Sequence, residues 1–435
     1  MTMFRGVVLD TPDDPFAGGR LRSSQDEGLL VRDGVIVARG PFGELRRAHP
    51  DEDVVALDGG LLLPGFVDTH VHFPQVRVIG RIGMPLLDWL EHCALPEEGR
   101  LADTGYAAQV ATDFVSGLVT AGTTSAMVFG SHFSAAVDAL FESAATVGLR
   151  VTSGLVVSDR NLPAELLSSS EKAYEESTGL ARRWHGTGRA RYAVTPRFSL
   201  SCSDRLLAAC AAVLDDVPGA SFTSHVNENL EEIEQVTRLF HLSTYVATYD
   251  RHGLLGPRSV LAHDVHPGDD ELETLAARNA SIAHCPTSNA ALGSGLFPLA
   301  RHVDHGVRVA LGSDVGAGSG FSLLKEGLQA YFTQRQLGAA GYALSPAHLL
   351  HLATSAGAAA LDLPEVGHLS VGQRFDAVWL RPAPGSTYDV ALRHASDPDD
   401  ALGKTFTLGT AADVAGVWID GDAVRLVDPQ GATGQ

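Results

Sequence analysis

The chain has 435 residues, of which 45% are hydrophobic and 19% charged, so it can form a buried core and is not a mainly disordered protein. Aspartate and glutamate number 52 against 32 lysines and arginines, which gives a formal net charge of −20 at pH 7. A surface this acidic repels phosphate groups, which argues against nucleic acid and anionic membranes as partners.

The cysteines and the first residues of the chain favour a cytoplasmic protein. The four cysteines lie far apart and form no C-x-x-C pair, so neither a disulfide framework nor a structural zinc module is expected. Residues 1–14 carry three aspartates and no apolar stretch, so no secretory signal is expected. The sequence also lacks a run of about 18 apolar residues, the length needed to cross a membrane.

Both ends of the chain carry the same β-hairpin signal. Residues 29–37 form two β-rich runs around Asp33-Gly34, and residues 414–421 repeat the pattern after a strand-like segment at 376–380. We expect one small β-sandwich domain built from residues 1–63 and 366–435. Two unrelated edge hairpins are the alternative.

Residues 64–365 alternate short apolar runs with longer helical patterns, such as those at 107–119, 135–147 and 230–239. This alternation is typical of βα units around a parallel sheet, and eight strands predict a (β/α)₈ barrel. The strands are expected at 61–72, 123–130, 150–157, 191–198, 221–228, 259–265, 280–286 and 307–314. Nearly all end in polar residues, which a barrel gathers at one mouth.

Two histidines, His70 and His72, end the first predicted barrel strand. Residues two apart on a strand point to the same side, so both imidazoles can reach one metal ion. Two histidines with this spacing also arise by chance. The prediction of a metal site is strengthened by three further candidate ligands at later strand ends: His225, His263 and Asp314. Imidazoles and a carboxylate without a thiolate fit Zn²⁺ or Fe²⁺, and unrelated polar residues are the alternative.

The blocks around these residues resemble the guanine deaminases of the amidohydrolase superfamily. The first block, LPGFVDTHVH at 63–72, resembles the superfamily's first strand, and the following Phe73-Pro74-Gln75 narrows it to the guanine deaminases. Further blocks stand in the family's order at 194–199, 224–229, 281–289, 292–297 and 312–318. The chain departs from the family at Ser313, where threonine is more frequent, and at Asp264, where a small residue or cysteine is usual.

The resemblance implies an enzyme that hydrolyses guanine to xanthine and ammonia, with one Zn²⁺ per chain, and a homodimer. Four residues would hold the zinc ion: His70, His72, His225 and Asp314. Zinc lowers the pKa of a bound water from about 15.7 to about 7. Binuclear relatives bridge two metals through a lysine at the end of the fourth strand. Because that strand ends in Thr195-Pro196-Arg197 and the nearest lysine, Lys172, lies in a polar run, a mononuclear site is expected.

The resemblance also implies roles for the remaining site residues. Asp314 would accept a proton from the attacking water, and Glu228 would protonate a ring nitrogen of the substrate. His263 would hydrogen-bond the attacking oxygen, or only support its neighbours. The alternative for Glu228 is a structural role, in which its negative charge stabilises the first turn of a helix.

The substrate pocket implied by the resemblance contains Gln75, Arg197 and Phe198 beside His225, Glu228 and Asp314. Arg197 would donate to O6 of guanine, Phe198 would cover the purine face and Gln75 would contact the opposite edge. The alternative for Arg197 is that it forms a structural ion pair. The alternative for Phe198 is that it packs in the hydrophobic core. Alternative functions are a related aminohydrolase for another purine, a pterin or a triazine, and a non-catalytic scaffold on the same fold.

Two further groups look structural from the sequence. His284-Cys285-Pro286 is expected to be a turn that supports the mouth of the barrel. The helix-spaced pairs His302/His305 and His348/His351 have no acidic partner in range and are expected to be exposed.

Overall fold

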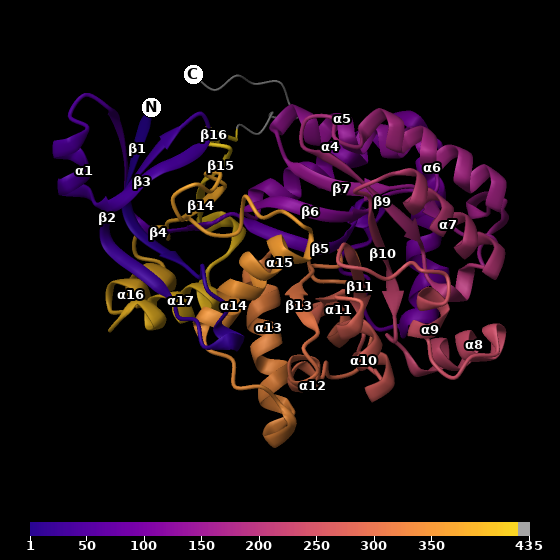
Figure 1. The fold of residues 1–435 in the computed structure, drawn as a ribbon. Coiled ribbons are helices and arrows are strands. Elements are labelled where there is room, and N and C mark those ends of the chain that lie inside the picture. Colours follow the sequence, from indigo (N-terminus) through magenta and orange to yellow (C-terminus); the bar gives the residue numbers. More distant parts are fainter. Residues whose placement is uncertain (425–435) are drawn as a thin grey trace.

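A computed structural model of the chain describes residues 1–424 (Figure 1). A barrel of parallel strands forms one half, with its helices outside it, and a smaller sheet drawn in indigo and yellow joins the two ends of the chain. The predicted (β/α)₈ barrel and the small β domain assembled from both ends are therefore confirmed.

The barrel contains eight parallel strands in sequence order, and the short β8 (Val156–Val157) pairs with β9. Its last strand meets its first through two backbone hydrogen bonds of 2.8 Å, from Asp314 N to His70 O and from His72 N to Val315 O. The strands are β5 (Phe66–His72), β6 (Thr123–Phe129), β7 (Arg150–Gly154), β9 (Ala190–Pro196), β10 (Ser221–Val226), β11 (Ser259–His263), β12 (Ser281–His284) and β13 (Arg308–Leu311).

One predicted strand, at 61–72, is two strands in the structure. β4 (Asp53–Pro64) belongs to the small sheet and β5 begins at Phe66, with Gly65 between them. A Cβ at Gly65 would lie 2.2 Å from Thr124 Oγ1, so glycine is needed where the chain passes from one sheet to the other. The apolar run hides this break because the end of β4 and all of β5 are buried.

Helices surround the barrel, and the three predicted from periodicity form as α4, α5 and α8. Their apolar faces pack on the strands in one large core cluster that includes Phe114, Leu118 and Leu140. The helices of the barrel half are α2 (Leu86–Trp89), α3 (Leu95–Gly99), α4 (Thr104–Thr120), α5 (Ser134–Val147), α6 (Ser170–Trp184), α7 (Asp204–Asp216), α8 (Leu230–Phe240), α9 (Val246–Asp250), α10 (Asp269–Ala277), α11 (Pro286–Ala291), α12 (Leu299–Asp304), α13 (Leu323–Gln336), α14 (Pro346–Ala353) and α15 (Ser355–Ala360).

The small sheet has seven strands in the order β16-β15-β14-β4-β1-β2-β3. Both predicted hairpins form: Asp33 and Gly34 have φ of 51° and 78°, and Asp420 and Gly421 have φ of 50° and 79°, the positive values of a type I′ turn. The other elements are β1 (Thr2–Asp10), β2 (Arg22–Arg32), β3 (Val35–Pro41), α1 (Phe42–Ala48), β14 (Ala377–Leu380), α16 (Thr387–Arg393), α17 (Pro398–Leu408), β15 (Val414–Ile419) and β16 (Asp422–Ala423).

The domain boundaries at residues 63 and 366 stay a prediction. The C-terminal segment contains two helices as well as strands, and α17 packs against α13 and α14. Residues 425–435 of the predicted small domain lie outside the described residues.

A buried arginine joins the two halves of the molecule. Arg150, the first residue of β7, binds Asp376 with two hydrogen bonds, from Nε at 2.9 Å and from Nη2 at 3.2 Å. It also pairs with Asp420 in the second hairpin. Both aspartates belong to the C-terminal part of the small sheet, so this cluster fixes that sheet to the base of the barrel.

We expect Arg150→Ala to lower the free energy of unfolding by about 3–5 kcal/mol, because it leaves Asp376 buried without its charged partner. Urea unfolding followed by circular dichroism measures the change. Arg393→Ala is the matched control: it removes an exposed pair with Asp389 and should cost about 0.5 kcal/mol or less. Equal losses in the two variants would contradict a special role for Arg150.

Candidate active site

Four predicted metal ligands meet at the mouth of the barrel. His72 Nε2 lies 3.1 Å from His70 Nε2 and 3.2 Å from His225 Nε2. Asp314 Oδ1 lies 3.3 Å from His70 Nε2 and 3.2 Å from His72 Nε2. β5 supplies two of these residues, β10 supplies His225, and Asp314 follows β13. Strands far apart in the sequence thus bring three imidazole nitrogens and one carboxylate oxygen together.

Hydrogen bonds behind the imidazoles set their orientation. His225 Nδ1 lies 2.6 Å from the carbonyl of Arg197, so Nδ1 carries the hydrogen and Nε2 offers its lone pair to the cluster. His263 Nδ1 lies 3.0 Å from Asn289 Oδ1, and the carboxylates of Glu228 and Asp314 raise the pKa of His263 although burial opposes them. Burial lowers the pKa of His70 to about 3 and that of His225 well below its usual value. Neutral imidazoles beside a carboxylate are the donor set that zinc binds, so these residues fit the ion.

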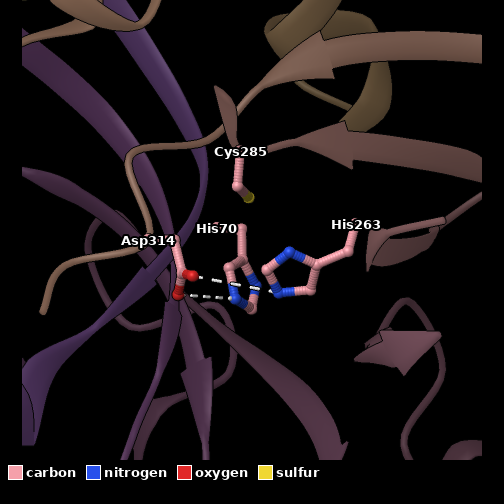
Figure 2. Close-up of side chains that lie close together, drawn as sticks. All are labelled: His70, His263, Cys285 and Asp314. Atoms are coloured by element: carbon pink, nitrogen blue, oxygen red, sulfur yellow. Dashed lines mark ion pairs between the residues drawn. The ribbon is translucent and has the colours of Figure 1, made fainter. Parts of the chain in front are cut away.

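A second set of possible ligand atoms overlaps the first. Figure 2 shows the Cys285 thiol pointing toward His70, His263 and Asp314, and one ligand atom from each of the four lies within 4.8 Å of the others. Burial raises the pKa of the Cys285 thiol well above its usual value. Cys285 was expected only as part of a supporting turn, since no spacing pattern links it to the histidines.

Glu228 lies beside this cluster, just beyond the end of β10. Its Oε1 accepts a hydrogen bond of 3.1 Å from Ser294 Oγ, and its Oε2 lies 3.5 Å from His263 Nε2. The side chain is buried, and this burial raises the pKa of the carboxyl. Glu228 therefore faces the site rather than the solvent-exposed face of α8, and it can hold a proton nearer to neutral pH than an exposed glutamate.

These side chains open into one cavity. Every residue that the sequence analysis assigned to the pocket lines it, as does His263. The lining residues are His72, Gln75, Leu86, Trp89, Leu90, Arg197, Phe198, His225, Glu228, His263, Leu292, Asp314 and Ala317.

Comparison with known proteins identifies the family. A model described as the amidohydrolase family matches residues 61–424. The chain belongs to the amidohydrolase family. A second model, an imidazolonepropionase-like composite domain of bacteria, matches residues 28–51 of the small sheet.

The individual proteins most similar to this amidohydrolase include several guanine deaminases. The chain is 56% identical over 432 residues to a probable guanine deaminase of Deinococcus radiodurans, with 98% of each chain covered. The solved structure of an E. coli guanine deaminase matches with a TM-score of 0.94 and 34% identity, over 98% of this chain and 100% of that one. A guanine deaminase from C. acetobutylicum, solved with guanine bound in its active site, matches with a TM-score of 0.90 and 25% identity, over 98% and 100%. The resemblance inferred from the sequence blocks is confirmed.

Glu98 is a site residue of this amidohydrolase that sequence reasoning missed. The carboxylate is buried and accepts two hydrogen bonds of 2.7 Å from Arg197 Nη1 and one of 2.8 Å from Gln75 Nε2. Burial alone would raise the pKa of Glu98, but the positive charge of Arg197, helped by the hydrogen bond from Gln75, outweighs it and lowers the pKa. Arg197 is thus both an ion-pair partner and a pocket residue.

The apolar side of the pocket was also missed. Trp89 belongs to a helical run that passes from α2 through a π-helical turn at Leu90–Ala94 into α3, where Glu98 lies. π-Helical turns occur frequently at functional sites. The apolar pattern of Leu86 to Leu90 looks like that of any buried helix, so the sequence held no signal that it faces a ligand.

The expected exposure of the helix-spaced histidines is wrong. His302 is fully buried, and its Nε2 lies 2.9 Å from Asp264 Oδ2. His305, His348 and His351 are partly buried. The acidic partner of His302 was missed because it lies 38 residues away in the sequence.

Membrane insertion through a helix finds no support: within residues 1–424, no helix is long and apolar enough to span a bilayer.

Proposed function

We propose that this amidohydrolase hydrolyses guanine at C2, giving xanthine and ammonia, with one zinc ion per chain. The observation that carries the proposal is one cavity lined by His72, His225 and Asp314, the buried Glu228 and the donor Arg197, with the fourth candidate ligand, His70, 3.1 Å from His72. Relatives named guanine deaminase, one of them solved with bound guanine, support guanine as the substrate.

His70, His72, His225 and Asp314 would hold the ion. Zinc in such a site supplies a nucleophilic water at neutral pH, by lowering the pKa of that water from about 15.7 to about 7. These three imidazoles and one carboxylate would hold the zinc ion without the Cys285 thiol, which lies near His70 and Asp314.

The protein residues move the protons. Water adds to C2, and Asp314 accepts the proton that the water loses, while His263 hydrogen-bonds the attacking oxygen. Glu228 gives its proton to a ring nitrogen, then takes up the proton of the new C2 hydroxyl and passes it to the exocyclic amine. The C2–N bond breaks, ammonia leaves, the C2 carbonyl of xanthine forms, and the proton held by Asp314 restores protonated Glu228. Glu228 suits the acid role because burial raises its pKa, whereas the histidines around Asp314 lower the pKa of that carboxyl well below its usual value even though burial opposes them.

The other pocket residues would orient the base. Glu98 holds Arg197 through Nη1, which leaves the remaining guanidinium N–H groups for O6 of guanine. Gln75 is fixed from both sides, because its Nε2 donates to Glu98 and its Oε1 accepts from Gly316 N at 3.1 Å. Phe198 and Trp89 supply apolar area for the purine face.

Purified protein incubated with guanine should form xanthine and ammonia in equal amounts, and elemental analysis should find one zinc per chain. A non-catalytic scaffold would release no ammonia and hold no stoichiometric metal. Iron in place of zinc would overturn the choice of metal but not the reaction.

We also infer, from the resemblance alone, a cytoplasmic homodimer, whose mass light scattering can measure.

We expect Glu228→Gln to lower kcat by about 10²–10⁴-fold, the usual contribution of a general acid, with zinc still bound. The amide keeps the size of the side chain and its contact with Ser294 but cannot give a proton to the substrate. Glu234→Gln is the matched control, because Glu234 is exposed on α8 and pairs only with Arg238 among the described residues. If Glu228→Gln stayed within about threefold of the wild type, an acid role for Glu228 would be wrong.

A further inference from the structure

Two left-handed turns carry the catalytic groups Glu228 and His263. Asn227, just before Glu228, has φ of 48°, and His263 and Asp264 have φ of 76° and 48°. Left-handed backbone costs a residue other than glycine about 1–3 kcal/mol and persists only where the surroundings hold it. The turns follow the neighbouring strands β10 and β11, so something buried between them must hold both.

The side chain of Asp264, a residue of the second turn, also contacts the first turn. Asp264 Oδ1 accepts a hydrogen bond of 2.9 Å from Asn227 Nδ2, and its Oδ2 accepts one of 2.9 Å from His302 Nε2 in α12. The backbone N–H of Asp264 donates to Val226 O, also at 2.9 Å. Asp264, Asn227 and His302 are each at most 1% exposed, so water does not compete for these bonds.

His302 holds the Asp264 carboxyl from the side of α12. Its Nδ1 lies 3.0 Å from the carbonyl of Pro298 and its Nε2 lies 2.9 Å from Asp264 Oδ2, so both ring nitrogens are engaged. The ring also stacks on Phe297, with centroids 4.4 Å apart and planes 24° apart. The histidine is therefore held from three sides and gives the carboxylate a rigid partner.

Asn227 is held by a second carboxylate as well. Its Nδ2 also donates to Glu271 Oε2 at 3.1 Å, and Glu271 is fixed by the backbone N–H groups of Gly268 and Val246 at 2.9 and 3.0 Å. The two hydrogens of the Asn227 amide are thus both used. The Asn227 carbonyl also accepts hydrogen bonds from the backbone N–H groups of Val265 and His266, at 3.0 and 3.1 Å, so the side-chain amide and the backbone of this turn are both tied to the segment that follows β11.

We propose that Asp264 is a positioning residue that sets the separation of His263 and Glu228. The role rests on the proposed function, in which these two groups act on opposite parts of the reacting centre. Their side chains lie 3.5 Å apart, Nε2 to Oε2; Glu228 follows Asn227, which the Asp264 carboxylate contacts, and His263 directly precedes Asp264. Asp264 touches no residue of the candidate metal set in the described hydrogen bonds, so it acts through the two turns.

Asp264→Ala removes both acceptors and places alanine at a left-handed φ. We expect kcat to fall by about 10²-fold, the cost of a misplacement near 1 Å, with KM within about threefold and zinc retained. Asp264→Asn should recover most of the rate, because its oxygen can still accept from Asn227 and its amide can donate to a neutral His302. Asparagine also tolerates the left-handed backbone.

His302→Phe keeps the ring stack on Phe297 and removes both ring nitrogens. We expect a smaller loss of kcat, and we expect the double variant with Asp264→Ala to be no slower than Asp264→Ala alone, because the two residues act as one unit. Asp269→Asn is the matched control: this exposed carboxylate pairs with Arg301, next to His302, and its loss should leave kcat unchanged.

Steady-state kinetics on guanine, zinc analysis and thermal unfolding are measured for every variant. The proposal is overturned if Asp264→Ala keeps kcat within about threefold of the wild type, if Asp264→Asn falls as far as Asp264→Ala, or if the double variant loses the product of the single losses. A wild-type protein that does not act on guanine would overturn the proposed function instead. Crystal structures then still decide the positioning role: the His263–Glu228 separation should exceed 3.5 Å in Asp264→Ala, and an unchanged separation would overturn it.

Discussion

His72→Ala should bind no stoichiometric zinc and form no xanthine above the rate without protein. Of the four ligands, His72 is the one whose Nε2 contacts all three others, at 3.1 Å from His70 and 3.2 Å from both His225 and Asp314. Alanine removes this central donor and leaves three ligand atoms around an open side. Zinc affinity depends on ligand count and geometry, so the ion should be lost during dialysis.

Elemental analysis after dialysis against a weak chelator, with activity measured on the same sample, tests this expectation. His92→Ala is the matched control, because His92 is exposed and its ring nitrogen contacts only the carbonyl of Asp88 among the described residues. One zinc per chain retained in His72→Ala, together with activity, would show that the cluster is not the metal site.

The candidate ligand set could be predicted from the sequence because a parallel barrel brings the ends of its strands together at one mouth. His70 and His72 share a face through the two-residue repeat of a strand, and the remaining candidates each stand at the end of a later parallel strand. The two Asp-Gly hairpins were readable for a similar reason, because their turns require a positive φ. In both cases a short local pattern, combined with a general rule of strand or turn geometry, is enough to make the prediction.

The missed features depend on contacts between distant segments. Glu98 reaches Arg197 across 99 positions, and Asp264 reaches His302 across 38, and no periodicity marks either pair. The break at Gly65 is hidden because β4 and β5 are apolar on both sides of it. Trp89 lines the cavity with the same apolar pattern that a core helix would have. A sequence pattern shows that a residue is buried, but not what it is buried against.

The last prediction concerns substrate choice: guanine should be turned over about 10⁴–10⁵-fold more efficiently than adenine. Arg197 is 3% exposed, and its guanidinium has hydrogen-bond donors only. With C2 at the metal cluster, guanine presents the acceptor O6 to Arg197. Adenine in that pose presents its 6-amino group, which leaves a buried N–H of a cation unpaired, and it carries no amino group at C2 to lose; turned so that C6 reaches the cluster, it has no O6 for Arg197. Sites built on such hydrogen bonds reject the wrong analogue far more strongly than pocket shape alone does.

Cytosine and guanosine should also be poor substrates. Cytosine is too small to reach both Gln75 and Arg197 from one pose at the metal cluster. Guanosine carries a ribose at N9, near the side of the pocket that Gln75 closes, and Gln75 is held between Glu98 and the backbone of Gly316. Ammonia release from the four compounds at equal concentration distinguishes guanine from another purine as the substrate, and a pterin and a triazine extend the panel to the remaining alternatives.

The same compounds measured with the Arg197→Ala variant test whether Arg197 causes the preference for guanine over adenine. Because this change leaves Glu98 buried without its cation, a loss of activity could reflect disorder around that carboxylate. The double variant Arg197→Met with Glu98→Gln removes both charges and keeps the volume, so it should stay folded, lose guanine turnover and narrow the gap between guanine and adenine. Arg205→Ala, which removes an exposed partner of Glu171, controls for the loss of an arginine. If adenine or cytosine equals guanine on the wild type, or if guanine turnover survives in the double variant, Arg197 does not select the substrate, and the O6 contact must be sought elsewhere in the cavity.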